Sequence, residues 1–80
     1  MKLMKDTRTK DQSSVVKVIE LIGSSPTSWE DATANAVEAA SRTVRNIVGV
    51  DLKRCTAKVE NNKIVVYRVD VKIAFVVEQE

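Results

Sequence analysis

The 80-residue sequence has no histidine, one cysteine and two glycines, and these scarcities exclude several kinds of site. Without an imidazole base, the usual serine and cysteine nucleophiles cannot be activated by histidine. Gly23 and Gly49 stand alone, so neither a phosphate-binding nor a dinucleotide-binding glycine loop is present. Cys55 cannot form an internal disulfide or, without histidine, complete a Cys/His zinc site. We therefore expect no catalytic residues and a protein that is not an enzyme.

The sequence also lacks a long apolar run and a strong excess of charge. No stretch approaches the roughly 18 apolar residues that cross a bilayer, and the first residues do not form a secretory signal. The net charge of +2 arises in residues 1–12, whereas nine basic and nine acidic side chains balance in the remainder. Nucleic-acid binding requires clustered Lys and Arg. The expectation is a cytoplasmic protein with no nucleic-acid partner and no membrane partner.

The first part of the chain divides into an extension, a strand and a helix start. Residues 1–14 are polar and aperiodic, so we interpret them as a flexible N-terminal extension before a single domain, residues 15–80. A β-branched run that closes on Gly23 predicts a strand, and residues 24–26 predict a turn. Thr27 with Glu30 has the spacing of a helix-capping box, and Ser28 with Asp31 would serve one residue later.

An amphipathic helix of about five turns is predicted next, because small and apolar residues recur at three- and four-residue spacing. Its expected buried face carries Trp29, Ala32, Thr33, Ala36, Ala40, Thr43, Val44 and Ile47. Its expected outward face carries Glu30, Asp31, Asn35, Glu38, Arg42 and Arg45. We interpret Trp29 as a hydrophobic staple or a core anchor in preference to a stacking platform for a ligand, and Gly49 as the end of the helical pattern.

Two strands joined by a hairpin follow. The apolar parity switches between residues 48–52 and 57–59, which predicts a one-residue bulge near residues 54–56. The polar residues 60–63 predict a hairpin turn. Over residues 65–77 the odd-numbered residues are apolar, while Arg68, Asp70 and Lys72 point the other way. The fold class is α+β, with β-α-β-β order and a three-stranded antiparallel sheet carrying one helix. Its two free edges and incomplete cover favour a homo-oligomer.

A few side chains leave a chemical role open. Glu30 with Asp31, or Glu78 with Glu80, could supply oxygen ligands to a divalent cation, although we favour a charge preference at the helix N-terminus and a solvated tail as their explanation. Cys55 beside Arg54 could be a reactive thiol or a small packed residue. The residues that would bind a metal are therefore unknown.

Two long segments resemble one family, the dodecins. They are KVIELIGSSPTSWEDATANAVEAASRTVRN, residues 17–46, and KIVVYRVDVKIAFVVE, residues 63–78. The resemblance implies a sheet that wraps around its helix and a hollow, near-spherical homododecamer. It also implies a protein that is not an enzyme and binds riboflavin or flavin mononucleotide (FMN) for storage and protection.

The departures from the family pattern fall at its ligand pocket. In flavin-binding dodecins an aromatic residue after the helix stacks on the flavin, and a glutamine after the last-strand tyrosine hydrogen-bonds the ring edge. Ungapped alignment places these positions at Gly49 and Arg68, and two family arginines at Thr56 and Val76. Gly49 offers no ring face, and Arg68 can donate but not accept. The pocket positions implied by the resemblance are Val48, Gly49, Val50, Thr56, Arg68 and Val76.

The sequence thus leads to a first hypothesis with two alternatives. The first is a dodecin-like homododecamer that binds and stores a small molecule or ion in a degenerate flavin pocket. It resembles the branch that lacks the stacking aromatic and has been linked to calcium. One alternative keeps riboflavin or FMN, with Val48, Val50 and symmetry-related residues closing the cavity. The other is a structural or interaction protein whose basic extension reaches a partner or a membrane surface.

Overall fold

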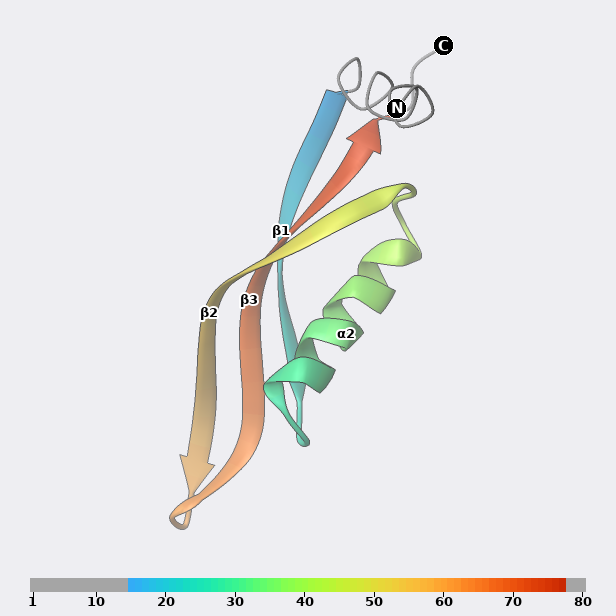
Figure 1. The fold of residues 1–80 in the computed structure, drawn as a ribbon. Helices are drawn as coiled ribbons and strands as arrows, with labels where there is room; N and C mark the ends of the chain where they lie inside the picture. The colour runs from blue at the N-terminus through green and yellow to red at the C-terminus, as the bar shows by residue number, and fades with distance from the viewer. Residues whose placement is uncertain (1–14, 78–80) are drawn as a thin grey trace, which may run out of the picture.

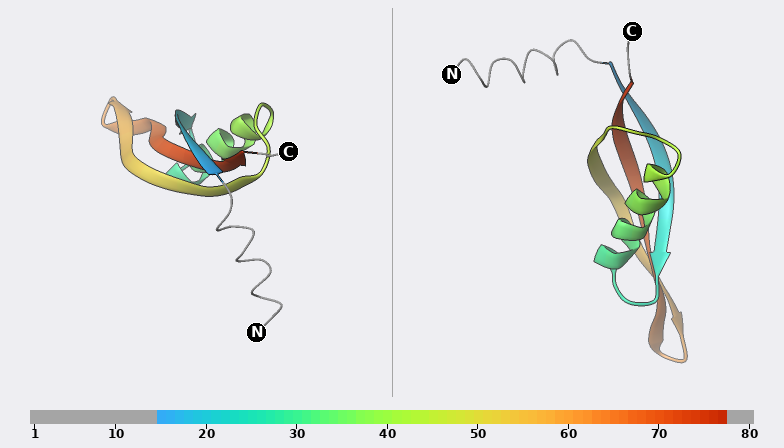
Figure 2. Two further views of the ribbon diagram at one scale, coloured as in Figure 1. Left: turned by 90° about the horizontal axis from the view of Figure 1, so that it is seen from above. Right: turned by 90° about the vertical axis from the view of Figure 1, so that its right-hand side faces the viewer.

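A computed structural model of the chain describes residues 15–77, which contain three strands and one helix. The elements are β1 (Val15–Ser25), α2 (Trp29–Ser41), β2 (Ile47–Glu60) and β3 (Lys63–Val77). The antiparallel sheet has the order β1-β3-β2. It curls around α2, which lies along one face (Figures 1 and 2). The predicted β-α-β-β architecture is confirmed; the N-terminal extension and the Glu78–Glu80 pair lie outside the described residues.

The alternation along β3 produces the core. Val69, Val71 and Ile73 are fully buried beneath α2, whereas Arg68 and Lys72 point to the opposite face and are exposed. β3 lies in the centre and pairs with both other strands, so its apolar row is covered from three sides. We call the face beneath α2 the helix face and the opposite one the open face.

Small residues allow α2 to approach the sheet closely. Ala32, Ala36 and Ala40 are buried against the β3 row, as the helical spacing predicts. Beneath them, Gly23 has no side chain, and a Cβ at that position would overlap the backbone carbonyl oxygen of Ala32. Close packing of this helix therefore requires both the alanine stripe and Gly23.

α2 begins with Ser28 as its N-cap, which is the second of the two capping arrangements expected from the sequence. The Ser28 hydroxyl accepts a hydrogen bond from the Asp31 amide at 3.0 Å. The prediction of a capping box between Thr27 and Glu30 is therefore wrong. Asp31 Oδ2 accepts from Ser25 Oγ at 2.7 Å, and Ser25 Oγ in turn accepts from the Thr27 amide at 2.9 Å. β1 continues through buried Ser25, two residues past the predicted end, because Ser24 and Ser25 still pair with β3. The cap and the strand end thus form one network.

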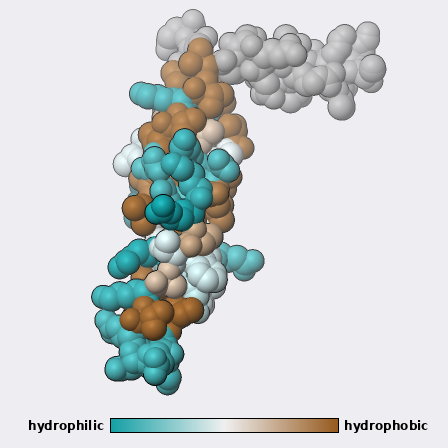
Figure 3. Space-filling model, turned by 90° about the vertical axis from the view of Figure 1, so that its left-hand side faces the viewer, coloured by the Kyte–Doolittle hydropathy of each residue, from teal (hydrophilic) through white to brown (hydrophobic). Residues whose placement is uncertain are grey.

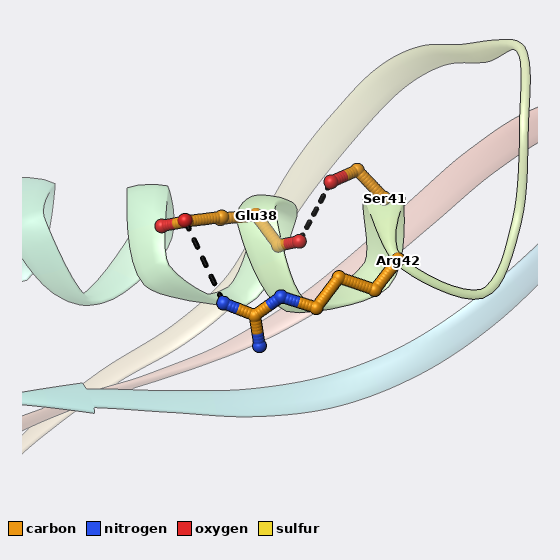
Figure 4. Close-up of polar contacts among 3 residues, drawn as sticks. All are labelled: Glu38, Ser41 and Arg42. Atoms are coloured by element: carbon orange, nitrogen blue, oxygen red, sulfur yellow. Dashed lines mark hydrogen bonds and ion pairs between the residues drawn. The ribbon is translucent and has the colours of Figure 1, made fainter.

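The helix is shorter than predicted and ends at Ser41 rather than beyond Ile47. The last turn tightens, because the Thr43 amide donates to the Ala40 carbonyl, and Asn46 turns the chain at a φ of 62°. Ser41 Oγ donates to the Glu38 carbonyl at 2.7 Å, beside an exposed Arg42–Glu38 ion pair (Figure 4). Val44 and Ile47 still pack against the core, as expected, but from the connection and from β2.

The β2–β3 pairing is irregular, as predicted, but the shift lies just before residues 54–56, and two further shifts fall between Ile47 and Gly49 and between Lys58 and Val59. The register shifts between Leu52 and Arg54, so Leu52 and Cys55 both reach the helix face across one extra residue. Asn61 and Asn62 have φ values of 51° and 64°, which confirms the hairpin turn at residues 60–63. The hairpin extends past the start of α2 as a two-stranded arm (Figure 1).

Candidate functional site

The expected pocket positions lie at two separate levels of the sheet. Gly49 pairs with Ala74 near one end, and Thr56 pairs with Arg68 toward the hairpin. Six residues of β3 separate these two rungs, which corresponds to about 20 Å along the strand. The fold therefore does not bring Gly49 and Arg68 into one cavity within a single chain.

The remaining three positions lie near Gly49. Val48 falls in a register shift between Ile47 and Gly49 and is 63% exposed. Val76 receives a backbone contact, since its amide donates to the Asn46 carbonyl at 3.0 Å. Val50 pairs with Ile73, which belongs to the helix-face row. Four of the six positions, Val48, Gly49, Val50 and Val76, are thus grouped at the end of the sheet near the connection from α2.

A cavity of about 310 Å³ opens at Gly49, lined by Val18, Gly49, Val50, Asp51, Lys72 and Ala74. Val18, Ala74 and Gly49 pair side by side across the three strands. Two apolar side chains and a glycine therefore form the floor of the cavity. A Cβ at Gly49 would meet no atom within 4 Å, and its φ is not positive. Neither the backbone nor packing within the chain requires a glycine here, so the space above Gly49 is open to a ligand or to another subunit.

Charged residues border this cavity on the hairpin side. The next rung pairs Lys72 with Glu20 on one side and Asp51 on the other. Lys53 Nζ lies 3.5 Å from Glu20 Oε2, with both side chains close to half exposed, so this pair contributes little stability. The sequence did not single out Val18, Asp51, Lys72 and Ala74 as ligand-lining residues, because only the strand register places them around Gly49.

At the other level, Trp29 links α2 to the β2 backbone. Its Nε1 donates to the Thr56 carbonyl at 2.8 Å, and its ring meets that of Tyr67 edge to face at 4.9 Å. Trp29 is 37% exposed, so it packs at the surface between α2 and β2 and is not buried in the core, one of the two roles expected for it. The amphipathic indole explains this position, since its ring packs while its N–H reaches a carbonyl.

The acidic residues within 15–77 do not assemble into a metal-binding group. No set of three or more His, Cys, Asp or Glu side chains gathers in this part of the chain. Of the predicted pair Glu30 and Asp31, Asp31 already accepts a hydrogen bond from the Ser25 hydroxyl. Asp70 is different, because its Oδ1 is buried and has no hydrogen-bond partner among the described residues. Cys55 is free and exposed.

Apolar side chains are exposed over much of the sheet. Figure 3 shows an apolar surface at the end of the sheet where β1 begins and a hydrophilic band beyond it. The exposed large apolar residues are Val15, Val16, Val18, Ile22, Val48, Val50, Leu52, Val59 and Ile64, together with Trp29. An apolar surface this extensive marks a site of association. Separately, no helix among the described residues is long and apolar enough to span a membrane.

Comparison with known proteins identifies the family. The dodecin family model matches residues 15–78. The calcium dodecin of Mycobacterium tuberculosis is 39% identical over 62 residues, covering 78% of this chain and 87% of that protein.

Solved structures agree in fold. The dodecin of Streptomyces coelicolor superposes with a TM-score of 0.81 at 26% identity, covering 85% of this chain and 97% of that one. A crystal structure of the M. tuberculosis calcium dodecin, described as calcium-chelating with a novel calcium-binding site, gives a TM-score of 0.72 at 36% identity. It covers 84% of this chain and 96% of its own. This chain belongs to the dodecin family.

Proposed function

We propose that this chain forms a hollow homododecamer that binds and stores a small ligand and has no enzymatic activity. The observation that supports the proposal most directly is the open cavity over Gly49, where flavin-binding dodecins carry the aromatic residue that stacks on the ring. Without that face, a stacking contribution of about 1–3 kcal/mol per ring face is lost. The pocket therefore lacks the stacking contact that flavin-binding dodecins provide, and in this sense it is a degenerate flavin pocket. A cytoplasmic location and the absence of nucleic-acid and membrane partners belong to the same proposal.

The proposed ligand is a calcium ion. This is suggested by the related calcium dodecin of M. tuberculosis. Because residues 15–77 of one chain offer no group of three acidic ligands, the coordination sphere would draw on more than one subunit. Asp70 is the carboxylate best suited to contribute, since its buried Oδ1 has no partner among the described residues.

Native mass spectrometry of the freshly purified protein tests the assembly and its contents together. Subunits of 8.9 kDa predict about 107 kDa for the dodecamer. That mass without flavin-sized increments supports the degenerate pocket. Flavin-sized increments would favour the alternative, riboflavin or FMN storage, which the family membership suggests. A monomer or dimer would contradict the proposal.

Calcium binding is tested by titrating the metal-free dodecamer calorimetrically. We expect Asp70→Asn to weaken calcium affinity at least about tenfold, because an amide oxygen carries no charge to offset the cation. Glu38→Gln, on the exposed face of α2, is the matched control and should leave the affinity unchanged. An equal affinity for wild type and Asp70→Asn would remove Asp70 from the site, and no binding at all would remove calcium.

The pocket assignment itself is tested by rebuilding the family pattern. The double substitution Gly49→Trp and Arg68→Gln should create or strengthen FMN binding, because it restores a stacking face and an amide that both donates and accepts. Since the two positions lie about 20 Å apart in one chain, they can serve one flavin only across subunits. Quenching of FMN fluorescence measures the affinity. An unchanged affinity in the dodecameric double variant would show that these positions do not line the pocket.

A further inference from the structure

A second cavity, of about 300 Å³, lies on the helix face at the end of the sheet, away from Gly49. Its walls come from β1, from the connection after α2 and from the last residues of β3. The lining residues are Lys17, Thr43, Val44, Arg45, Asn46, Phe75, Val76 and Val77. Val76 is also one of the pocket positions implied by the family resemblance, but the proposals above assign no ligand to this cavity.

Lys17 is the unusual feature of this cavity. On β1 the helix-face row reads Val15, Lys17, Ile19 and Leu21, so a single charge interrupts an apolar series. Lys17 pairs with Phe75 across the sheet, and Ile19 and Leu21 pack against the core beneath α2. Its ammonium group has no ion-pair partner among residues 15–77. A lysine over an apolar floor can cover that floor with its stem while offering its charge at the rim.

The rest of the lining defines the chemistry of the occupant. Val44, Phe75 and Val77 supply apolar surface, and the positive charge offered to a ligand is that of Lys17. No acidic side chain of residues 15–77 lines the cavity. The cavity is an open concavity whose apolar walls and few polar groups at one side suit a small amphipathic molecule that stays partly in contact with solvent.

We propose that this cavity binds a compact amphipathic carboxylate, with its ring or branched apolar body against Phe75 and its carboxylate at the Lys17 ammonium. The charge complementarity and the apolar floor together select this class over neutral apolar molecules and over strongly polar anions. The proposal is independent of the ligand at Gly49 and survives if calcium and flavin both fail to bind.

The experiment uses the assembled full-length protein and 1-naphthoate, an aromatic carboxylate, followed by isothermal titration calorimetry. We expect Lys17→Met, which keeps the apolar stem and removes the charge, to weaken binding about fivefold or more. Lys17→Arg should retain most of the affinity. Lys63→Met, at the exposed hairpin, is the matched control and should bind as wild type does. Raising the salt concentration should weaken binding, because the rim is exposed and screened.

Two further readouts separate this site from non-specific adsorption. The neutral analogue 1-naphthalenemethanol should bind more weakly than 1-naphthoate, and hydrogen exchange should slow at residues 43–46 when 1-naphthoate is bound. Lys17 on an edge strand could instead serve to prevent strand-to-strand aggregation. In that case Lys17→Met would aggregate yet bind 1-naphthoate as wild type does. That result, absence of binding, or equal binding of the neutral analogue would overturn the proposal.

Discussion

The two glycines of this chain serve opposite purposes. At Gly23 the space that a side chain would need is taken by α2, because an added methyl group would lie 3.0 Å from the Ala36 Cβ and closer still to the Ala32 carbonyl. At Gly49 the same space is empty. The first glycine is therefore required for folding of the subunit, and the second is free to serve binding or assembly.

This contrast predicts opposite effects of the same substitution. Gly23→Ala should lower the free energy of unfolding by about 1–3 kcal/mol, because the added methyl group forces α2 away from the sheet. Gly49→Ala should be neutral or stabilise by about 0.5–1 kcal/mol, since alanine loses less backbone entropy on folding. Urea unfolding of both variants measures the difference. Similar losses for the two variants would contradict the packing argument.

At the scale of elements, the start of α2 is fixed by side chains and its end by the backbone. Ser28 caps the first turn, and Asp31 ties it to Ser25 at the end of β1. At the other end no basic residue lies in the last turn, and the exposed Arg42–Glu38 pair contributes little. Side-chain hydrogen bonds therefore fix the start of α2 more specifically than its end.

The caps can be compared with one type of substitution. Ser28→Ala should lower the free energy of unfolding by about 1 kcal/mol, because the Asp31 amide loses its acceptor. Ser41→Ala removes only an exposed hydroxyl that back-bonds to Glu38, so its effect should stay within about 0.5 kcal/mol. Thermal unfolding followed by circular dichroism distinguishes the two. A larger loss for Ser41→Ala would show that the helix end matters more.

For the whole molecule, the exposed apolar surface is the dominant feature. Ile22 is 70% exposed and lies on the open face, beside Asp70 in the register. A small three-stranded domain that leaves such residues in water is expected to bury them against other copies.

Ile22→Lys should therefore weaken assembly more than it weakens the subunit fold. A charge at a contact between copies costs the lost apolar burial and the desolvation of the ammonium group. Ala34→Lys, on the exposed side of α2, is the control. Native mass spectrometry over a dilution series reports the assembly, and circular dichroism reports the fold. Retention of the wild-type assembly by Ile22→Lys at every dilution would place Ile22 outside the contacts.

The order of elements, the apolar row of β3, the alanine stripe of α2 and the asparagine hairpin were all predictable, because each depends on local periodicity or turn chemistry. The end of the helix was predicted too far along. Val44 and Ile47 keep helical spacing and do reach the core, yet they do so on either side of Asn46, where the chain turns. Periodicity therefore predicts which side chains are buried, but it does not predict whether a helix, a connection or a strand holds them.

The sequence by itself determined the fold class, the family resemblance and the substitution of glycine at the position of the stacking aromatic. Only the tertiary structure decided what surrounds that glycine. The register between strands distant in sequence sets Val18 and Ala74 beside Gly49 and places Arg68 at another level. It also brings Lys17 over Phe75 at the end of the helix face. Register depends on the sum of many cross-strand contacts and on three shifts in the β2–β3 pairing, so no local pattern specifies it.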